Sequence, residues 1–90
     1  MPDIRRRYIF YGRVQGVGFR YTAKYGARSL GLTGFVENDW DGTVVMEVQG
    51  REALHYKLLT LLNNNLYIQI DHYDTIELPL DHEERSFTSR

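Results

Sequence analysis

The sequence has 90 residues, which is enough for one small domain that buries its own hydrophobic core. Hydrophobic residues make up 42% and charged residues 26%, as in ordinary globular proteins, and the net charge of −1 gives no overall attraction for nucleic acid. The absence of cysteine excludes disulfides and thiolate zinc sites, and no signal-peptide pattern or apolar run of membrane-spanning length is found. We therefore expect a single cytoplasmic domain over residues 1–90, with no nucleic-acid or membrane partner.

The N-terminal third predicts a strand, a glycine-rich loop and a helix. Tyr8 to Val14 is rich in aromatic and β-branched residues, which favours a strand. The glycines of the stretch 12–18 allow backbone conformations with positive φ. From Phe19 to Leu30, small and apolar residues recur at helical spacing, and Gly31 suits the left-handed position that ends many helices. Gly26, inside this helix, indicates a point where another element approaches closely.

The rest of the chain predicts two strands joined by a hairpin, a second helix and further β structure. These elements are expected over Thr33–Asn38, Thr43–Gln49, Arg51–Leu62 and Tyr67–Leu78. An Asp-Gly pair provides the hairpin turn, Gly50 is expected to break the second of these strands, and three asparagines stop the second helix. A short run at residues 86–88 is a candidate fifth strand.

This β-α-β-β-α-β order predicts an α+β protein. The split β-α-β pattern is typical of the ferredoxin-like sandwich, in which an antiparallel sheet carries two helices on one face.

The glycine-rich loop is the strongest candidate for a functional site. A bent loop followed by a helix start aims several backbone N–H groups at one point, and these groups favour a bound anion. Arg20 adds a planar guanidinium with a fork of donors at the mouth of this cradle. The loop therefore predicts a phosphate site, whose proposed ligands are Gln15, Gly16, Val17, Gly18, Phe19 and Arg20.

Each of these residues also has a simpler explanation when it is taken alone. Gly16 and Gly18 are suited to an ordinary turn. Arg20 alone would be a solvated residue at a helix start, where the helix dipole disfavours a cation. Asn38 alone would be a hairpin residue.

Other features have alternative interpretations that do not require a second site. His55, His72 and His82 show no spacing for a shared metal, so no metal site is expected. Asp39 and Asp41 are better explained as solvated turn acids than as a catalytic pair.

The basic and aromatic residues near the N-terminus offer a further interpretation, that of a nucleic-acid-binding module. The run Arg5-Arg6-Arg7 is a short candidate arm for a polyanion, and Tyr8, Phe10 and Tyr11 are candidates for base stacking. Strand alternation should bury at least one of these aromatic residues, so they are interpreted chiefly as core residues.

Two motifs together resemble the acylphosphatase family. The stretch Gly12–Arg20 matches that family's phosphate-loop signature without a gap, and Gly34–Asn38, continuing through Gly42, Val44 and Gly50, matches a second motif. The resemblance implies hydrolysis of acyl phosphates to carboxylate and inorganic phosphate by a monomer that needs no metal or other cofactor. It also implies that Arg20 and the loop bind phosphate and that Asn38 orients the attacking water. An anion-binding module of the same fold without turnover is the alternative.

Three positions depart from the family pattern. Glu37 replaces a basic, amide or small residue, and its side chain should point away from that of Asn38. Three asparagines and Leu66 replace the usual Gly-Pro segment after the second helix, and the chain ends in Phe87-Thr88-Ser89-Arg90 instead of the usual Phe-x-Ile-Arg-Tyr.

Overall fold

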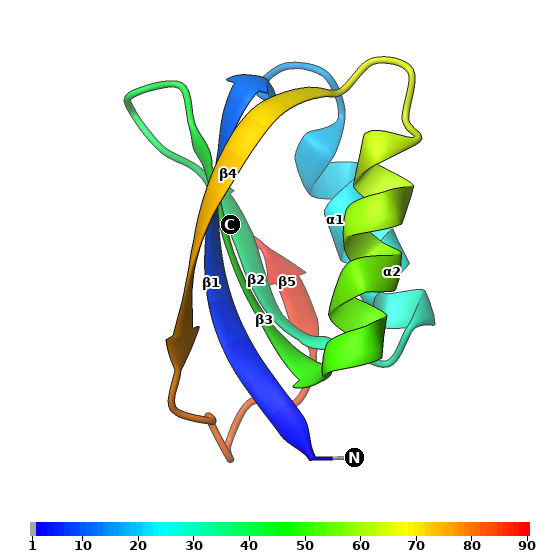
Figure 1. Ribbon diagram of the computed structural model, residues 1–90, viewed down its shortest axis with the longest axis vertical. Helices are drawn as coiled ribbons and strands as arrows, with labels where there is room; N and C mark the ends of the chain where they lie inside the picture. The colour runs from blue at the N-terminus through cyan, green and yellow to red at the C-terminus, as the bar shows by residue number, and fades with distance from the viewer. Residues whose placement is uncertain (1) are drawn as a thin grey trace.

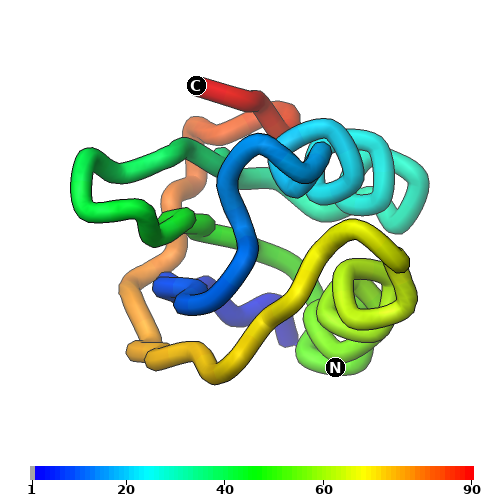
Figure 2. Tube along the Cα trace, turned by 90° about the horizontal axis from the view of Figure 1, so that it is seen from above, coloured from blue at the N-terminus to red at the C-terminus, as the bar shows by residue number. Residues whose placement is uncertain are grey.

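The computed structural model describes residues 2–90, which form one sheet of five strands with two helices on one of its faces (Figures 1 and 2). The elements in chain order are β1 (Asp3–Arg13), α1 (Phe19–Ser29), β2 (Thr33–Asn38), β3 (Val44–Arg51), α2 (Glu52–Asn63), β4 (Gln69–Leu78) and β5 (Phe87–Ser89). The strand order across the sheet is β4-β1-β3-β2-β5. The ferredoxin-like α+β fold is therefore confirmed. Neither helix within residues 2–90 has the length and apolar character needed to span a bilayer.

The sheet is mixed, which corrects the expectation of a wholly antiparallel sheet. The first four strands pair in antiparallel fashion, but β5 lies parallel to β2, with Phe87 opposite Gly34. The connection 79–86 carries the chain across one end of the sheet, so β5 enters from the same end as β2 (Figure 1). Two further backbone bonds hold this edge, because Gly34 N donates to Ser86 O at 3.1 Å and Arg90 N donates to Val36 O at 2.8 Å.

Strand pairing explains why β1 begins earlier, and β3 ends later, than the sequence predicts. β1 begins at Asp3 instead of Tyr8, because its charged first half is hydrogen-bonded to β3 on one side and, from Arg5, to β4 on the other. β3 continues through Gly50, where a strand break was predicted, because Gly50 pairs with Ile4 of β1. Gly50 has φ +156°, and a Cβ atom there would lie 2.3 Å from Cδ2 of Leu32, which precedes β2, so glycine suits both this backbone conformation and the close approach of that side chain.

The core lies between the sheet and the two helices. It includes Tyr8 and Phe10 of β1, three residues of the predicted α1 stripe (Phe19, Ala23 and Ala27), Val36, Met46, Leu58, Leu62 and Phe87. Burial of Tyr8 and Phe10 confirms their interpretation as core residues and leaves neither ring free to stack on a base. Tyr11 lies on the opposite face, where its ring stacks on His72 with centroids 4.2 Å apart.

The two helices approach each other closely at Gly26, as predicted. A Cβ atom at this position would lie 3.1 Å from Leu58 Cδ1 and 3.2 Å from Leu61 Cδ1. Leu61 lies at this contact and is 44% exposed, whereas His55, which is also in α2, is buried with 1% exposure.

Both ring nitrogens of His55 have hydrogen-bond partners within the fold, so we interpret it as a structural residue. Nε2 lies 3.2 Å from both Ile4 O and Gly50 O, and Nδ1 lies 3.1 Å from the Tyr8 hydroxyl. Because a carbonyl oxygen only accepts, Nε2 carries the hydrogen and Nδ1 accepts from Tyr8. Burial lowers the pKa of His55. Among residues 2–90, no three His, Asp or Glu side chains are grouped so that they could hold a metal.

A charged cluster covers part of the sheet. The ion pairs are Arg5 with Glu47 and Glu84, Arg6 with Glu52 and, at 3.9 Å, with Glu77, and Arg7 with Glu47. Arg5 is buried, and its guanidinium lies 3.0 Å from Glu47 and 2.7 Å from Glu84, which ties the connection 79–86 to β1 and β3. The basic run at residues 5–7 is therefore engaged within the fold, which argues against its use as a polyanion-binding arm.

Candidate active site

Three connections meet at one end of the sheet. They are the β1–α1 loop (14–18), the β2–β3 hairpin (39–43) and the α2–β4 connection (64–68) (Figures 1 and 2). The antiparallel directions of the strands explain this arrangement, because β1 and β2 end here while β3 and β4 begin here.

Two glycines shape the β1–α1 loop. Gly16 has φ +73° and Gly18 has φ +81°, and a Cβ atom at either position would meet nothing within 4 Å. The requirement for glycine is therefore conformational and not a matter of space. Gly18 directly precedes α1, and no side chain caps the helix. The N–H groups of the first helical turn have no acceptor within the helix, as at any helix start, so they favour an anion in front of them.

A cavity of about 190 Å³ opens in front of this loop. Its lining residues are Val14, Gly16, Gly18, Phe19, Arg20, Tyr21 and Asn38. The structure thus brings Arg20 and Asn38, which come from different motifs, to the same cavity as the loop glycines. We refer to it as the small cavity.

Arg20 is held by the residue that follows β5. Its Nη1 donates to Arg90 O at 2.9 Å. Arg90 is itself fixed, because its N–H donates to Val36 O and its guanidinium lies 3.8 Å above the Phe35 ring. The motif 12–20 contains no signal for this contact, so sequence reasoning missed it.

Gln15 links the loop to the hairpin. Its Nε2 donates to Asp39 O at 2.7 Å and to Thr43 O at 2.9 Å, the two carbonyl groups at the base of the hairpin. Asn38 is the last residue of β2 and directly precedes this hairpin. The backbone contact to phosphate predicted for Gln15 stays a prediction, and the structure adds a role for its side chain, which joins two elements of the site.

Asp39 and Asp41 accept hydrogen bonds within the hairpin, as expected for turn residues. Asp41 Oδ1 accepts from the Thr43 hydroxyl at 2.6 Å and from Thr43 N at 3.0 Å. The hydrogen bonds from the Thr43 hydroxyl and backbone lower the pKa of the Asp41 carboxyl. Asp39 Oδ1 accepts from Trp40 N at 2.8 Å.

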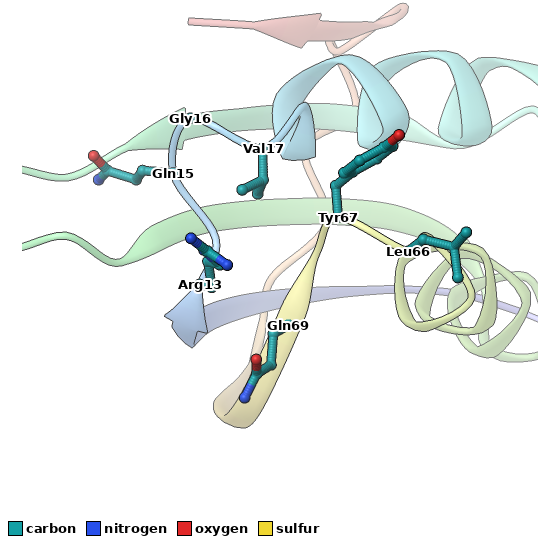
Figure 3. Close-up of a pocket in the computed structure, with 7 residues that line it drawn as sticks. All are labelled: Arg13, Gln15, Gly16, Val17, Leu66, Tyr67 and Gln69. Carbon is teal, nitrogen blue, oxygen red and sulfur yellow. The ribbon is translucent and has the colours of Figure 1, made fainter.

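A second and larger cavity lies beside the loop. It measures about 610 Å³, and its lining residues are Arg13, Gln15, Gly16, Val17, Leu66, Tyr67 and Gln69 (Figure 3). We refer to it as the large cavity. The predicted phosphate ligands are therefore divided between two hollows: Gln15 and Val17 line the large cavity, and Gly16 lines both.

Comparison with known proteins agrees with this architecture. The model of the acylphosphatase family matches residues 6–89. An acylphosphatase from Clostridium perfringens is 44% identical over 87 residues, which cover 96% of this chain and 98% of that protein. The crystal structure of acylphosphatase from Bacillus subtilis is 28% identical and covers 97% of this chain and 98% of that one. The structure of an acylphosphatase from Coxiella burnetii is 25% identical and covers 98% of this chain and 93% of that one, and both structures superpose with a TM-score of 0.87. The chain belongs to the acylphosphatase family.

Proposed function

We propose that this member of the acylphosphatase family hydrolyses acyl phosphates to a carboxylate and inorganic phosphate, with the phosphoryl group bound in the small cavity. The observation that carries the proposal is the convergence of the loop glycines, Arg20 and Asn38 on that one cavity. Water attacks phosphorus, the bond between phosphorus and the acyl oxygen breaks, and its electron pair leaves with the carboxylate.

The loop and Arg20 stabilise the phosphoryl group. Backbone N–H groups of residues 15–20, with the Arg20 guanidinium, are directed at oxygens on which charge is spread in the transition state. Because Arg20 is anchored on Arg90, its guanidinium is positioned before substrate arrives. Fixed donors of this kind need little reorganisation during the reaction.

Asn38 orients the water. Its carboxamide offers one acceptor and two donors, so it can accept a hydrogen bond from the water while donating to the phosphoryl group. An amide is no base at neutral pH, and a phosphoryl oxygen of the substrate takes the proton. The leaving carboxylate is a weak base, so the reaction needs no strong general acid.

Hydrolysis of benzoyl phosphate in the presence of EDTA tests the proposal. We expect the parent protein to release benzoate and phosphate at a rate that chelation does not change. Asn38→Ala should lower kcat about 100-fold, the order of effect seen when a group that acts on the transition state is removed, with little change in KM. The matched control is Asn64→Ala, which removes an exposed carboxamide from the end of α2. If phosphate binds but benzoyl phosphate is not turned over, the alternative of a binding module is correct.

We further propose that the protein acts as a monomer in the cytoplasm, in line with its size and its lack of cysteine. Sedimentation equilibrium at micromolar concentration tests the first point, with a mass of 10.6 kDa expected.

A further inference from the structure

The large cavity contains a cation that the proposed mechanism does not use. Arg13 is the last residue of β1 and lines this cavity (Figure 3). It takes part in none of the ion pairs formed among residues 2–90, whereas the three arginines at 5–7 on the same strand are all paired. An arginine whose charge is not matched within the fold is available to an anionic ligand.

Among residues 2–90, Arg13 is the one charged residue that lines this cavity. The Gln15 carboxamide already donates to the hairpin carbonyls, and Gln69 Nε2 donates to Asp71 Oδ1 at 3.1 Å. Gln69 is the residue paired with Arg13 on β4.

The rest of the lining adds exposed apolar side chains to a mostly polar surface. Tyr67 is 76% exposed and Leu66 is 96% exposed; Leu66 belongs to the segment that replaces the usual Gly-Pro of the family, and Tyr67 follows it. Figure 3 shows the Val17 side chain between those of Arg13 and Tyr67. A carbon chain or ring placed here would meet the apolar groups of Val17, Leu66 and Tyr67 beside a guanidinium.

The two cavities adjoin at the loop, because Gly16 lines both. We propose that a substrate whose phosphoryl group lies in the small cavity places its acyl part in the large one, and that Arg13 selects acyl phosphates whose acyl part carries a carboxylate. This inference rests on the proposed function. A single guanidinium matches a carboxylate in charge and geometry.

The test compares benzoyl phosphate with its 3-carboxy and 4-carboxy derivatives. The rigid ring keeps the added carboxylate away from the reacting carbonyl, so neither derivative can break down by internal attack. We expect Arg13→Gln to lower kcat/KM for at least one carboxylated substrate ~3- to 5-fold more than for benzoyl phosphate, which is the size of effect that an exposed ion pair supports. This difference should shrink in 1 M salt, because screening weakens an exposed charge pair.

Arg85→Gln is the matched control. Arg85 is an exposed arginine in the connection 79–86, at the opposite end of the sheet from the loop (Figure 1). Arg85→Gln removes the same charge as Arg13→Gln, and we expect it to change kcat/KM for all three substrates by the same factor. If Arg13→Gln also acts equally on all three, the inference is wrong while the proposed function stands. If the parent hydrolyses none of them, both are wrong.

Discussion

Arg20 occupies a position that is unfavourable for a cation. It lies in the first turn of α1, where the helix dipole is positive, and no acidic residue is present in that turn. Its bond to Arg90 O offsets only part of this cost. A phosphoryl dianion in the small cavity would interact favourably with both the dipole and the guanidinium, so we propose that Arg20 contributes more to binding than to folding.

Replacement of Arg20 separates these two contributions. Arg20→Ala should raise KM for benzoyl phosphate and lower kcat, for a total loss in kcat/KM of about 10³-fold, because it removes a donor that contacts substrate and transition state alike. Lys24→Ala removes a cation one turn further along the same helix and should leave both constants within about twofold of the parent. Equal losses in the two variants, measured by steady-state kinetics, would mean that only the general charge of α1 matters.

At the scale of elements, the site depends on how the loop is joined to the hairpin. The Gln15 carboxamide provides two hydrogen bonds between them, and both acceptors flank the turn that follows Asn38. The proposed phosphate loop and the hairpin that follows Asn38 are therefore held in one relative position. We interpret Gln15 as a positioning residue in addition to any contact that its backbone makes.

Gln15→Ala should lower kcat about 10-fold and raise KM less than twofold, because the loop can still bind phosphate while Asn38 loses its fixed position. Gln15→Glu should be at least as impaired, since a carboxylate cannot donate to the two carbonyl groups and would repel them. Steady-state kinetics on benzoyl phosphate checks both variants. A purely structural role would instead lower the melting temperature in Gln15→Ala without this separation of kcat from KM.

The charged cluster on the sheet is a second junction between elements. Glu47 lies between two arginines of β1, and only 12% of its side chain is exposed. Glu47→Ala should lower the free energy of unfolding by about 2–3 kcal/mol, because it leaves buried Arg5 with one carboxylate partner instead of two. Glu52→Ala is the control: its pair with Arg6 is at the surface, with 48% of the Glu52 side chain exposed, and should cost less than about 1 kcal/mol. Urea unfolding measures both, and equal costs would contradict the role given to burial.

Element-scale features were predictable where local sequence decides them. The order of elements, the Asp-Gly hairpin and the close approach at Gly26 were all correct, because turn chemistry and side-chain periodicity are local properties. The N-terminal half of β1 was missed because its charged residues resemble a loop, and they form a strand only through pairing with β3 and β4. The parallel β5, the Arg20–Arg90 contact and the Gln15 bridge depend on residues far apart in sequence, so no local pattern could indicate them.

At the scale of the whole molecule, stability is linked to pH through His55. Burial is the main cause that lowers its pKa in the folded state, below the ordinary value of 6.5. The unfolded chain therefore binds more protons than the folded one near and below pH 6.5. The stability that neutral His55 contributes is present in full above about pH 6.5. As the pH falls from there towards the folded-state pKa, the free energy of unfolding decreases by up to about 1.4 kcal/mol per pH unit.

Urea unfolding at pH 7.5 and 5.5 tests this linkage. The parent should lose stability at pH 5.5, and His55→Gln, although less stable at pH 7.5, should lose distinctly less between the two values. His82→Gln removes an exposed histidine and should retain the parental pH dependence. If His55→Gln and His82→Gln show the same dependence, other groups account for the loss.

The central position of β1 also has a consequence for how the protein is made. β1 is synthesised before every other strand of the sheet, yet one of its two neighbours, β4, is the fourth of the five strands in chain order. The nascent chain therefore carries an early strand with an unpaired edge until residue 78 has emerged, and the contacts that close the sheet join residues far apart in sequence. The loop that follows β1 is translated before most of this fold, but its scaffold is complete only once β4 and β5 have followed.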